Sequence, residues 1–481
     1  MGKKRNILLL LSLVFILSSC YYPMHDGKGN AIKNEEDGKR VIAQMNGEII
    51  EEEEEEKPIE KPKKAKLVFV GNILPQSPVM EASLVGENTY DFKPIFEKIK
   101  PRVDKADLAL ASLEGSLAGD LGAYSTVGQY NLPDEILEGL KYSGFNMVNT
   151  ATDRILDFGK PGFERTLEKI KDAGLDNLGS QTSPSEDTNI YKDVDGIKIA
   201  LIAASEYYND KEDLIKSHQM EGLINQIGEG QDLLDSIARA KSKKADLVVV
   251  YLNWGEDYNS RANTYQKDLA NKLAQAGADL IVGARPHLVQ EVEYIDRPDG
   301  LKTLVAYSTG NTISNQRLET MSGYMHHKLA QATEVGLLLE VDIVKEDEKT
   351  SIAKVDKIPL WVDKATDETG NSRFLIYEAK SEVEKNDLDP AKLLRLKDAI
   401  RFIDELTSAS FSLDVKPEQA PLEENKPSNE EENPGGQVNL QPESESEIKE
   451  DQENLEEKEE TDLEKESENL NELENKEEDN N

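Results

Sequence analysis

The chain has 481 residues with 95 acidic and 57 basic side chains, which gives a formal net charge of −38 at pH 7. A protein this acidic is repelled by a phosphate backbone, so we expect no nucleic acid partner. Cys20 is the only cysteine, which excludes an internal disulfide. The length is sufficient for one large domain or two ordinary ones.

The first twenty residues predict export followed by lipid attachment. A positive start at Lys3, Lys4 and Arg5 precedes an apolar run at 7–17, which is shorter than the roughly 20 residues that span a bilayer. The sequence LSSC then places small residues before Cys20, as in the lipobox of bacterial lipoproteins. We therefore expect residues 1–20 to be a lipoprotein signal peptide. The mature protein would be anchored through lipid on Cys20 to the outer face of the cell membrane, as in Gram-positive bacteria. The alternative is a plain signal peptide with an incidental cysteine.

Two segments are too polar to form a core. Residues 21–64 contain the run Glu51–Glu56 and predict a stalk between membrane and domain. Residues 412–481 contain no aromatic side chain, and from Lys416 onward 25 acidic residues stand against 6 lysines, which is half of the net charge. This acidic tail is predicted to be disordered, because its few apolar side chains cannot offset the lost chain entropy.

Residues 65–411 are predicted to form one α/β domain, because apolar runs of strand length alternate with segments of helical period. The strands are predicted at 66–73, 107–114, 145–151, 197–205, 245–254, 278–284, 335–344 and 357–362, and the clearest helices at 161–174, 264–277 and 389–406.

Local signals support these elements. Gly174 and Gly277 are placed as helix C-terminal glycines. Asp389 and Pro390 are suited to the first positions of the last helix. Asp-Gly pairs at 195–196 and 299–300 predict hairpin turns, so the domain should contain antiparallel as well as parallel pairing.

Short polar clusters follow five of the predicted strands. Because strand ends converge at one edge of a sheet, we expect these clusters to share one pocket. The clusters are Gly71-Asn72, Ser112-Leu113-Glu114, Thr152-Asp153-Arg154, Asn253-Trp254-Gly255-Glu256-Asp257 and the sequence GARPHL at 283–288.

The order of these motifs resembles the CapA family, the capsule-type poly-γ-glutamate synthesis proteins, which look like calcineurin-type metallophosphatases. The resemblance runs from about Lys66 to Asn315 and includes LDFGKPGFERTLEKIKDAGLDNLGS, NTYQKDLANKLAQAGADLIVGARPHLVQEVE and VAYSTGNTISNQ. It implies a mixed-sheet αββα sandwich of the metallophosphatase type and a role in capsule, poly-γ-glutamate or cell-envelope biology.

The chain departs from the family where the resemblance implies metal ligands. The family has Gly-Asp at Gly71-Asn72, Asn-Leu-Glu at Ser112-Leu113-Glu114, Asn-Asn-His at Thr152-Asp153-Arg154, His-Trp-Gly at Asn253-Trp254-Gly255 and Gly-x-His-Pro-His at Gly283-Ala284-Arg285-Pro286-His287. A metallophosphatase-like centre needs carboxylate and imidazole ligands for the cations that activate water. Among the metal ligands that the resemblance implies, only Glu114 and His287 are unchanged. Asp153 offers oxygen where the family has asparagine.

These departures favour a pseudoenzyme, a binding or scaffold module for which we expect no metal or other cofactor. The alternative is an active metal-dependent hydrolase or transferase that acts on poly-γ-glutamate or an envelope polymer. It would use a single divalent metal, for which the weak candidate ligands are Asn72, Glu114, Asp153 and His287.

The candidate pocket residues are Asn72, Glu114, Asp153, Arg154, Asn253, Arg285 and His287. Asn72 either caps its strand or lines the pocket. Glu114 is predicted to be structural and to accept hydrogen bonds from nearby backbone N–H groups. His287 is predicted to be half-buried and hydrogen-bonded.

Four further residues are predicted to have no part in chemistry. We expect Trp254 to pack in the core and Asp157 to brace its loop. His326 and His327 are expected to point apart in a solvent-exposed loop, because neighbours on a regular strand or helix face different directions.

Arg154 and Arg285 stand where the family has histidines. A guanidinium group is always charged and presents planar donors that suit carboxylate or phosphate. The two arginines could therefore bind an anionic polymer such as poly-γ-glutamate or an envelope glycan. The alternative is that each pairs with a local acid, Asp153 or Asp157 for one and Glu256 or Asp257 for the other.

The lipid anchor can be tested directly. Replacing Cys20 by alanine removes the acceptor thiol, so we expect Cys20→Ala to be released from membranes or to keep its signal peptide. Membrane fractionation with metabolic lipid labelling measures both effects. A variant that stays membrane-bound, mature in size and lipid-labelled would contradict the assignment.

Overall fold

We describe the protein from a computed structural model, over residues 61–366 and 370–409. The predicted signal peptide with Cys20, nearly all of the predicted stalk and the acidic tail lie outside the described residues. Strand β1 begins at Lys63, two residues before the predicted start of the domain. In the described part, no helix combines the length and apolarity that crossing a bilayer requires.

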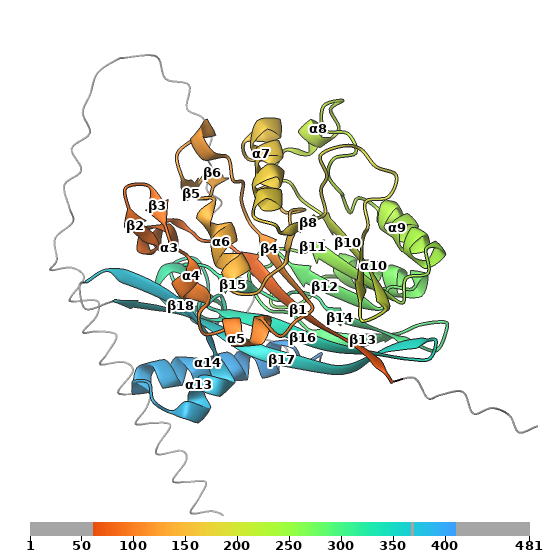
Figure 1. Cartoon of the computed structure of the whole chain (residues 1–481). Coiled ribbons are helices and arrows are strands. Elements are labelled where there is room, and N and C mark those ends of the chain that lie inside the picture. Colours follow the sequence, from red (N-terminus) through yellow and green to blue (C-terminus); the bar gives the residue numbers. More distant parts are fainter. Residues whose placement is uncertain (1–60, 367–369, 410–481) are drawn as a thin grey trace, which may run out of the picture. The chain divides into compact units, whose positions relative to one another are not determined.

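Two mixed sheets face each other, and helices cover the outer surfaces (Figure 1). In the first sheet the strand order is β18-β17-β16-β1-β4-β7-β8, and β15 pairs with β1. In the second sheet the order is β13-β14-β12-β11-β10-β9. Both sheets combine parallel and antiparallel pairs. The predicted αββα sandwich is confirmed.

The strands of the first sheet are β1 (Lys63–Ile73), β4 (Leu108–Leu113), β7 (Met147–Asn149), β8 (Asp176–Leu178), β15 (Asn311–Ile313), β16 (Val335–Glu346), β17 (Lys349–Thr366) and β18 (Ser372–Glu378). Those of the second are β9 (Ile190–Val194), β10 (Ile197–Ser205), β11 (Leu247–Asn253), β12 (Leu280–Ala284), β13 (Val292–Asp296) and β14 (Lys302–Ala306). Two short hairpins are β2 (Leu84–Gly86) with β3 (Thr89–Tyr90), and β5 (Ser125–Val127) with β6 (Gln129–Asn131).

The helices are α3 (Ser77–Ala82), α4 (Lys93–Phe96), α5 (Lys100–Val103), α6 (Glu135–Tyr142), α7 (Gly159–Asp172), α8 (Glu212–Ile215), α9 (Gln231–Ser242), α10 (Thr264–Ala276), α11 (Leu318–Met321), α12 (His327–Ala332), α13 (Ala379–Lys385) and α14 (Pro390–Leu406), with a 3₁₀ turn at Gly119–Leu121.

Alternation along β1 explains the layers, because successive side chains of a strand point to opposite faces. Leu67 and Phe69 belong to the apolar cluster between the two sheets, together with side chains of β10, β11, β12 and β14. Val68 and Val70 belong to the cluster on the outer face, together with side chains of α4 and α6. Helices α9 and α10 cover the outer face of the second sheet.

Most predicted boundaries agree with the structure within a few residues. Gly174 and Gly277 have the positive φ of helix-ending glycines, and Asp389 accepts from the Lys392 N–H as predicted for an N-cap. Both predicted hairpins are present. The strand predicted at 145–151 is shorter, because the Phe145 N–H bonds back to Leu140 and the Asn149 side chain bonds Ala151 in a turn. Strand β17 begins at Lys349, well before the predicted start at 357. The sequence did not reveal its first half, because that half is largely exposed and lacks an apolar run.

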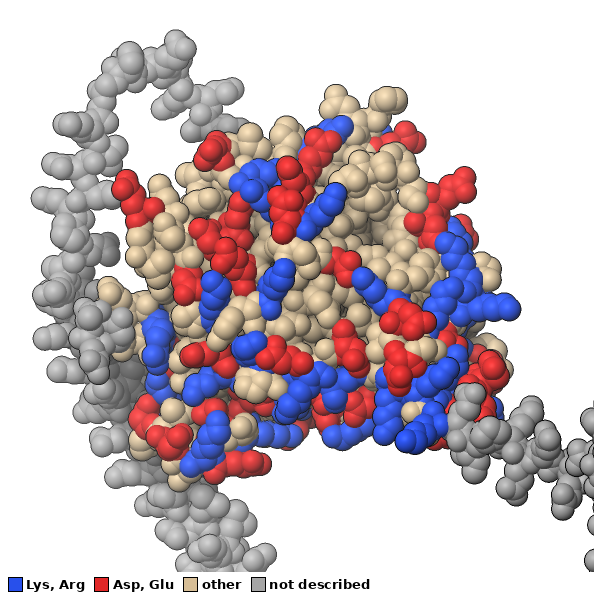
Figure 2. All heavy atoms as spheres, in the orientation of Figure 1, with Lys and Arg blue, Asp and Glu red and all other residues tan. Residues whose placement is uncertain are grey.

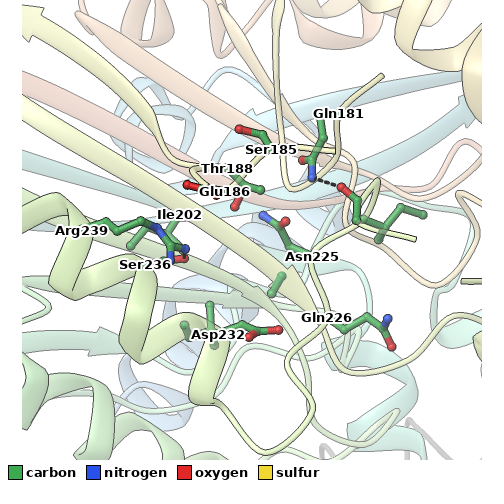
Figure 3. Close-up of a pocket in the computed structure, with 14 residues that line it drawn as sticks. Gln181, Ser185, Glu186, Thr188, Ile202, Asn225, Gln226, Asp232, Ser236 and Arg239 are labelled. Atoms are coloured by element: carbon green, nitrogen blue, oxygen red, sulfur yellow. Dashed lines mark hydrogen bonds between the residues drawn. The ribbon is translucent and has the colours of Figure 1, made fainter. Parts of the chain in front are cut away.

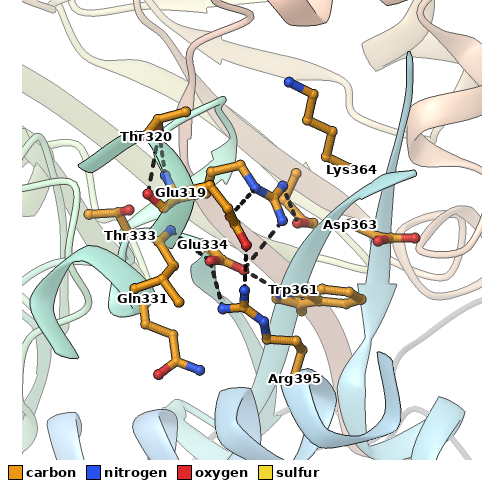
Figure 4. Close-up of polar contacts among 12 residues, drawn as sticks. Glu319, Thr320, Gln331, Thr333, Glu334, Trp361, Asp363, Lys364 and Arg395 are labelled. Carbon is orange, nitrogen blue, oxygen red and sulfur yellow. Dashed lines mark hydrogen bonds and ion pairs between the residues drawn. The ribbon is translucent and has the colours of Figure 1, made fainter. Parts of the chain in front are cut away.

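A buried ion network attaches α14 to the first sheet (Figure 4). Glu334, which is 1% exposed, lies just before β16 and pairs with Arg395 of α14 at 3.1 Å. Its other oxygen accepts from the Trp361 indole at 2.9 Å. The Glu334 carboxylate is therefore compensated on both oxygens, as burial of a charge requires.

Charges of both signs are interspersed over the face seen in Figure 2, although the whole chain is strongly acidic. Some of these charges pair directly, as Lys66 does with Glu340 and Asp342 at 2.5 and 2.6 Å. This face therefore offers no broad field of one sign to a charged polymer.

Close backbone packing at the strand ends requires glycine. A Cβ on Gly283 of β12 would overlap the Tyr307 carbonyl oxygen and the Trp254 indole. We expect Gly283→Ala to lower the free energy of unfolding by about 1–3 kcal/mol, as for other overpacked cores. Chemical denaturation measures the loss. The control is Gly323→Ala, whose added methyl meets nothing within 4 Å; equal stability of the two variants would contradict the close packing.

Candidate functional site at the strand ends

The polar clusters that follow the predicted strands come together at one edge of the sandwich. Within the sheets, Asn72 is in register with Ser112, and Asn253 with Ala284. Between the sheets, the Asn253 side chain donates to Glu114 at 2.9 Å, and the Arg285 backbone N–H donates to Asn72 Oδ1 at 3.1 Å. Arg285 also reaches Asp153. All five clusters therefore contribute to one site.

The guanidinium of Arg285 lies between two carboxylates. Its Nε is 2.9 Å from Asp153 Oδ2, and its Nη1 is 3.1 Å from Asp257 Oδ1. Nη1 also donates to the Gly255 carbonyl, and the group lies 4.3 Å from the centre of the Tyr207 ring. The Arg285 and Asp153 side chains are only 15% and 18% exposed, so solvent screens this pair weakly.

The loop that carries Arg285 has an unusual backbone. Arg285 has φ 100° and His287 has φ 60°, values that cost non-glycine residues of the order of 1–3 kcal/mol each. The backbone bond from Arg285 to Asn72 and the ion pairs of its side chain hold the loop in this form. The strained loop is thus maintained by the same residue that neutralises the acids.

Arg154 is held separately from Arg285. Its Nη1 donates to the Gly128 carbonyl at 3.2 Å and lies 3.8 Å from Asp157 Oδ2, and its guanidinium is 4.3 Å from the centre of the Tyr130 ring. Arg154 thus pairs with Asp157, and Arg285 pairs with both Asp153 and Asp257. This agrees with the alternative that each arginine pairs with a local acid.

The hydrogen-bond donor to Glu114 differs from the predicted one. It is buried at 4% exposure, and its side chain accepts from the Asn253 amide and not from backbone N–H groups. The reason is that β11 of the opposite sheet brings Asn253 to it. Burial raises the pKa of the Glu114 carboxyl well above its usual range, and nearby Asp153 raises this pKa further.

Asn72 is fully buried and lies within β1, where it contributes to the site and does not merely end a strand. Its Nδ2 is 3.1 Å from His287 Nδ1, which also lies 3.0 Å from Asn311 Oδ1. His287 is partly buried and hydrogen-bonded, as predicted. Sequence reasoning missed Asn311, although it follows an apolar run in VAYSTGN as the other site residues do.

Two of the residues predicted to be outside the chemistry, Trp254 and Asp157, have the predicted structural roles. Trp254 is fully buried, and its indole donates to the Tyr307 carbonyl at 2.8 Å, which confirms packing. Asp157 accepts from the Tyr130 N–H and from Asn209 at 2.8 and 2.9 Å, which confirms that it braces its loop.

The prediction that His326 and His327 point apart is wrong, because their ring centroids are 4.2 Å apart. His326 is the N-cap of α12 and has a non-helical backbone, so the spacing of a regular element does not apply.

The donor set does not match a metallophosphatase-type centre. Within residues 61–366 and 370–409, no three His, Cys, Asp or Glu side chains converge as metal ligands would. The carboxylate Oδ2 of Asp153 is engaged by a guanidinium, and His287 Nδ1 is engaged by two asparagine amides. The residues present therefore neutralise each other and leave no cluster of free anionic donors.

Comparison with known sequences identifies relatives in capsule synthesis. The family described as "Bacterial capsule synthesis protein PGA_cap" matches residues 66–316. The "Capsule biosynthesis protein CapA" of Bacillus anthracis is 25% identical over 334 residues, 67% of this chain and 78% of that protein. The "PGA biosynthesis protein CapA" of Bacillus subtilis is 26% identical over 226 residues, 46% of this chain and 57% of that protein.

Among solved structures, the calcineurin-like phosphoesterase YfkN of Bacillus subtilis is 13% identical, with a TM-score of 0.36, over 72% of this chain and 98% of that one. The 5'-nucleotidase of Candida albicans is 10% identical, with a TM-score of 0.35, over 72% of this chain and 58% of that one. Similarity at this level says nothing about the chemistry of the present site.

The buried Glu114 carboxyl gives the stability a defined pH dependence. The folded chain holds this proton more tightly than the unfolded chain does, so the contribution of Glu114 falls as pH rises above the unfolded pKa of about 4.3. Glutamine keeps the acceptor for Asn253 and has no proton to lose. Relative to wild type, Glu114→Gln should therefore gain thermal stability between pH 4.5 and 7.5.

Thermal unfolding at several pH values measures this gain, and each pKa unit corresponds to about 1.4 kcal/mol. The matched control is Glu168→Gln, at an exposed glutamate on α7, which should show no such trend. A constant difference between Glu114→Gln and wild type across this range would show that Glu114 is ionised when folded.

Proposed function

This chain belongs to the bacterial capsule synthesis protein family, and from that premise we propose that it is a non-catalytic binding or scaffold module of capsule, poly-γ-glutamate or cell-envelope assembly. We propose further that lipid on Cys20 holds it at the outer face of the membrane. The observation that carries the proposal is the Arg285 guanidinium between Asp153 and Asp257.

The chemistry of hydrolysis explains why this observation matters. A metal centre polarises the scissile group and lowers the pKa of bound water. A guanidinium group can neutralise acids and donate hydrogen bonds, but it is neither a Lewis acid nor a general base at physiological pH. With Asp153 and Asp257 paired to Arg285, these two carboxylates are engaged by a group that cannot itself activate water.

The proposed partner is an anionic polymer, such as poly-γ-glutamate or an envelope glycan. Arg154 and Arg285 are already paired with acids of the domain, so we do not assign these two cations to polymer binding.

One observation favours the alternative, an active enzyme with a single divalent metal. Asp153 Oδ1 is buried and has no hydrogen-bond partner among the described residues, and a buried carboxylate oxygen usually has one. A cation held by Asn72, Glu114, Asp153 and His287 would fill that role if the Arg285 side chain moved away. Such a cation would polarise an ester or amide of the envelope polymer.

Metal content separates the two functions. We expect the full chain, after dialysis against chelator, to hold no stoichiometric Zn, Mn or Fe by elemental analysis, because several family ligands are absent together. Asp153→Ala and His287→Ala should be indistinguishable from wild type in this measurement. A stoichiometric metal in wild type that both variants lose would establish the alternative.

A further inference from the structure

A polar pocket lies on the outer face of the second sheet and shares no lining residue with the strand-end site (Figure 3). Its floor includes Ile202 and Ala204 of β10, and one wall is formed by α9. Segments 181–188 and 222–226 supply the other walls. The volume of about 320 Å³ is at the lower end of the range for small-molecule sites, roughly 300–1,000 Å³.

Arg239 of α9 lines this pocket with part of its donor capacity unused. Its Nη2 donates to Ser236 Oγ at 2.6 Å, while its buried Nε has no hydrogen-bond partner among the described residues. Asp187 Oδ1 forms an ion pair with Nε at 3.8 Å, which is too long for a hydrogen bond. The other oxygen of Asp187, Oδ2, contacts Lys243 at 2.5 Å and the Tyr191 hydroxyl at 3.1 Å. The Nε atom itself is covered by the protein, but the Arg239 side chain as a whole is 35% exposed and lines the pocket, so an external acceptor can reach the guanidinium from there.

Two acidic side chains at the pocket are free to bind a cation. Glu186 and Asp232 both line it and are exposed, and in the described part of the chain neither makes a hydrogen bond or an ion pair. In Figure 3 Asn225 lies between Glu186 and Asp232, with Arg239 to one side. The Asn225 amide donates to the Ala203 carbonyl at 2.9 Å, which holds its side chain in place.

We propose that this pocket binds a small zwitterion, namely an unblocked amino acid, either free or at the amino-terminal end of a chain. The ligand carboxylate is bound by Arg239, and the ligand ammonium by Glu186 and Asp232. A simple anion would meet two unpaired carboxylates, and a neutral sugar would leave the charges of both signs without partners. A zwitterion matches both signs.

This inference is independent of the strand-end site. The lining residues come from α9, β10 and the two connecting segments, and none of them is among the motif residues at the strand ends. The metal measurement therefore says nothing about the pocket, and ligand binding here says nothing about metal at the strand ends.

Isothermal titration of the full chain tests the proposal with four probes: glutamate, γ-glutamylglutamate, N-acetylglutamate and glucose. Glutamate or the dipeptide should bind saturably. N-acetylglutamate lacks the ammonium and should bind at least tenfold more weakly, about 1.4 kcal/mol. Tighter binding of the dipeptide would identify a chain end as the source of the ligand, and tighter binding of glutamate would identify the free amino acid.

Variants locate the binding. Arg239→Gln should weaken the bound probe at least tenfold, and Asp232→Asn should weaken the zwitterion without weakening N-acetylglutamate. Arg401→Ala, on exposed α14 surface, should leave binding unchanged. Thermal unfolding verifies that each variant is folded. Absence of saturable binding by glutamate and by the dipeptide, equal binding of N-acetylglutamate, or glucose binding that Arg239→Gln abolishes would each overturn the proposal.

Discussion

The apolar layer between the two sheets is the contact on which the rest of the structure depends. Leu67 and Phe69 from the first sheet share this layer with Leu201 and Val249 from the second. Burial of side chains of this size stabilises a domain by about 1.5–3 kcal/mol each, and here it also fixes the sheets face to face. Because the strands are held in this way, the ends of β1, β4, β11 and β12 meet at one edge. Segments far apart in sequence, such as 72 and 285, then become hydrogen-bonded neighbours.

Arg285 determines the chemical character of that edge. Bringing acidic side chains together in a partly buried site is unfavourable unless a cation compensates them. Here the cation is a side chain, fixed by Asp153 and Asp257, and its loop adopts an unfavourable backbone to place it there. The acids at this edge are thus neutralised from within the protein.

The strand-end site and the pocket beside α9 differ in how far their charged groups are paired within the protein. At the strand ends most polar groups find partners within the protein, with the Asp153 Oδ1 atom as an exception. Beside α9, the exposed carboxylates of Glu186 and Asp232 make no ion pair in the described part of the chain, and Arg239 lines the same hollow. Groups of opposite sign around one hollow are the basis of the proposal that it binds a zwitterion. The two regions can thus serve different roles within one domain.

Local interactions account for what could be read from the sequence. The strands at 197–205 and 245–254, the glycine-ended helices and the N-cap at Asp389 follow from side-chain periodicity and capping, which depend on residues a few positions apart. The motif order likewise predicted the sandwich and the convergence of the clusters. The polar partners could not be read in this way. Asn311 reaches His287, and Asn253 reaches Glu114, only because strands distant in sequence are paired or stacked. The acids chosen by Arg285 depend on loop paths that no short-range preference specifies. Short-range preferences thus set the elements, and the packing of the two sheets decided which polar side chains meet.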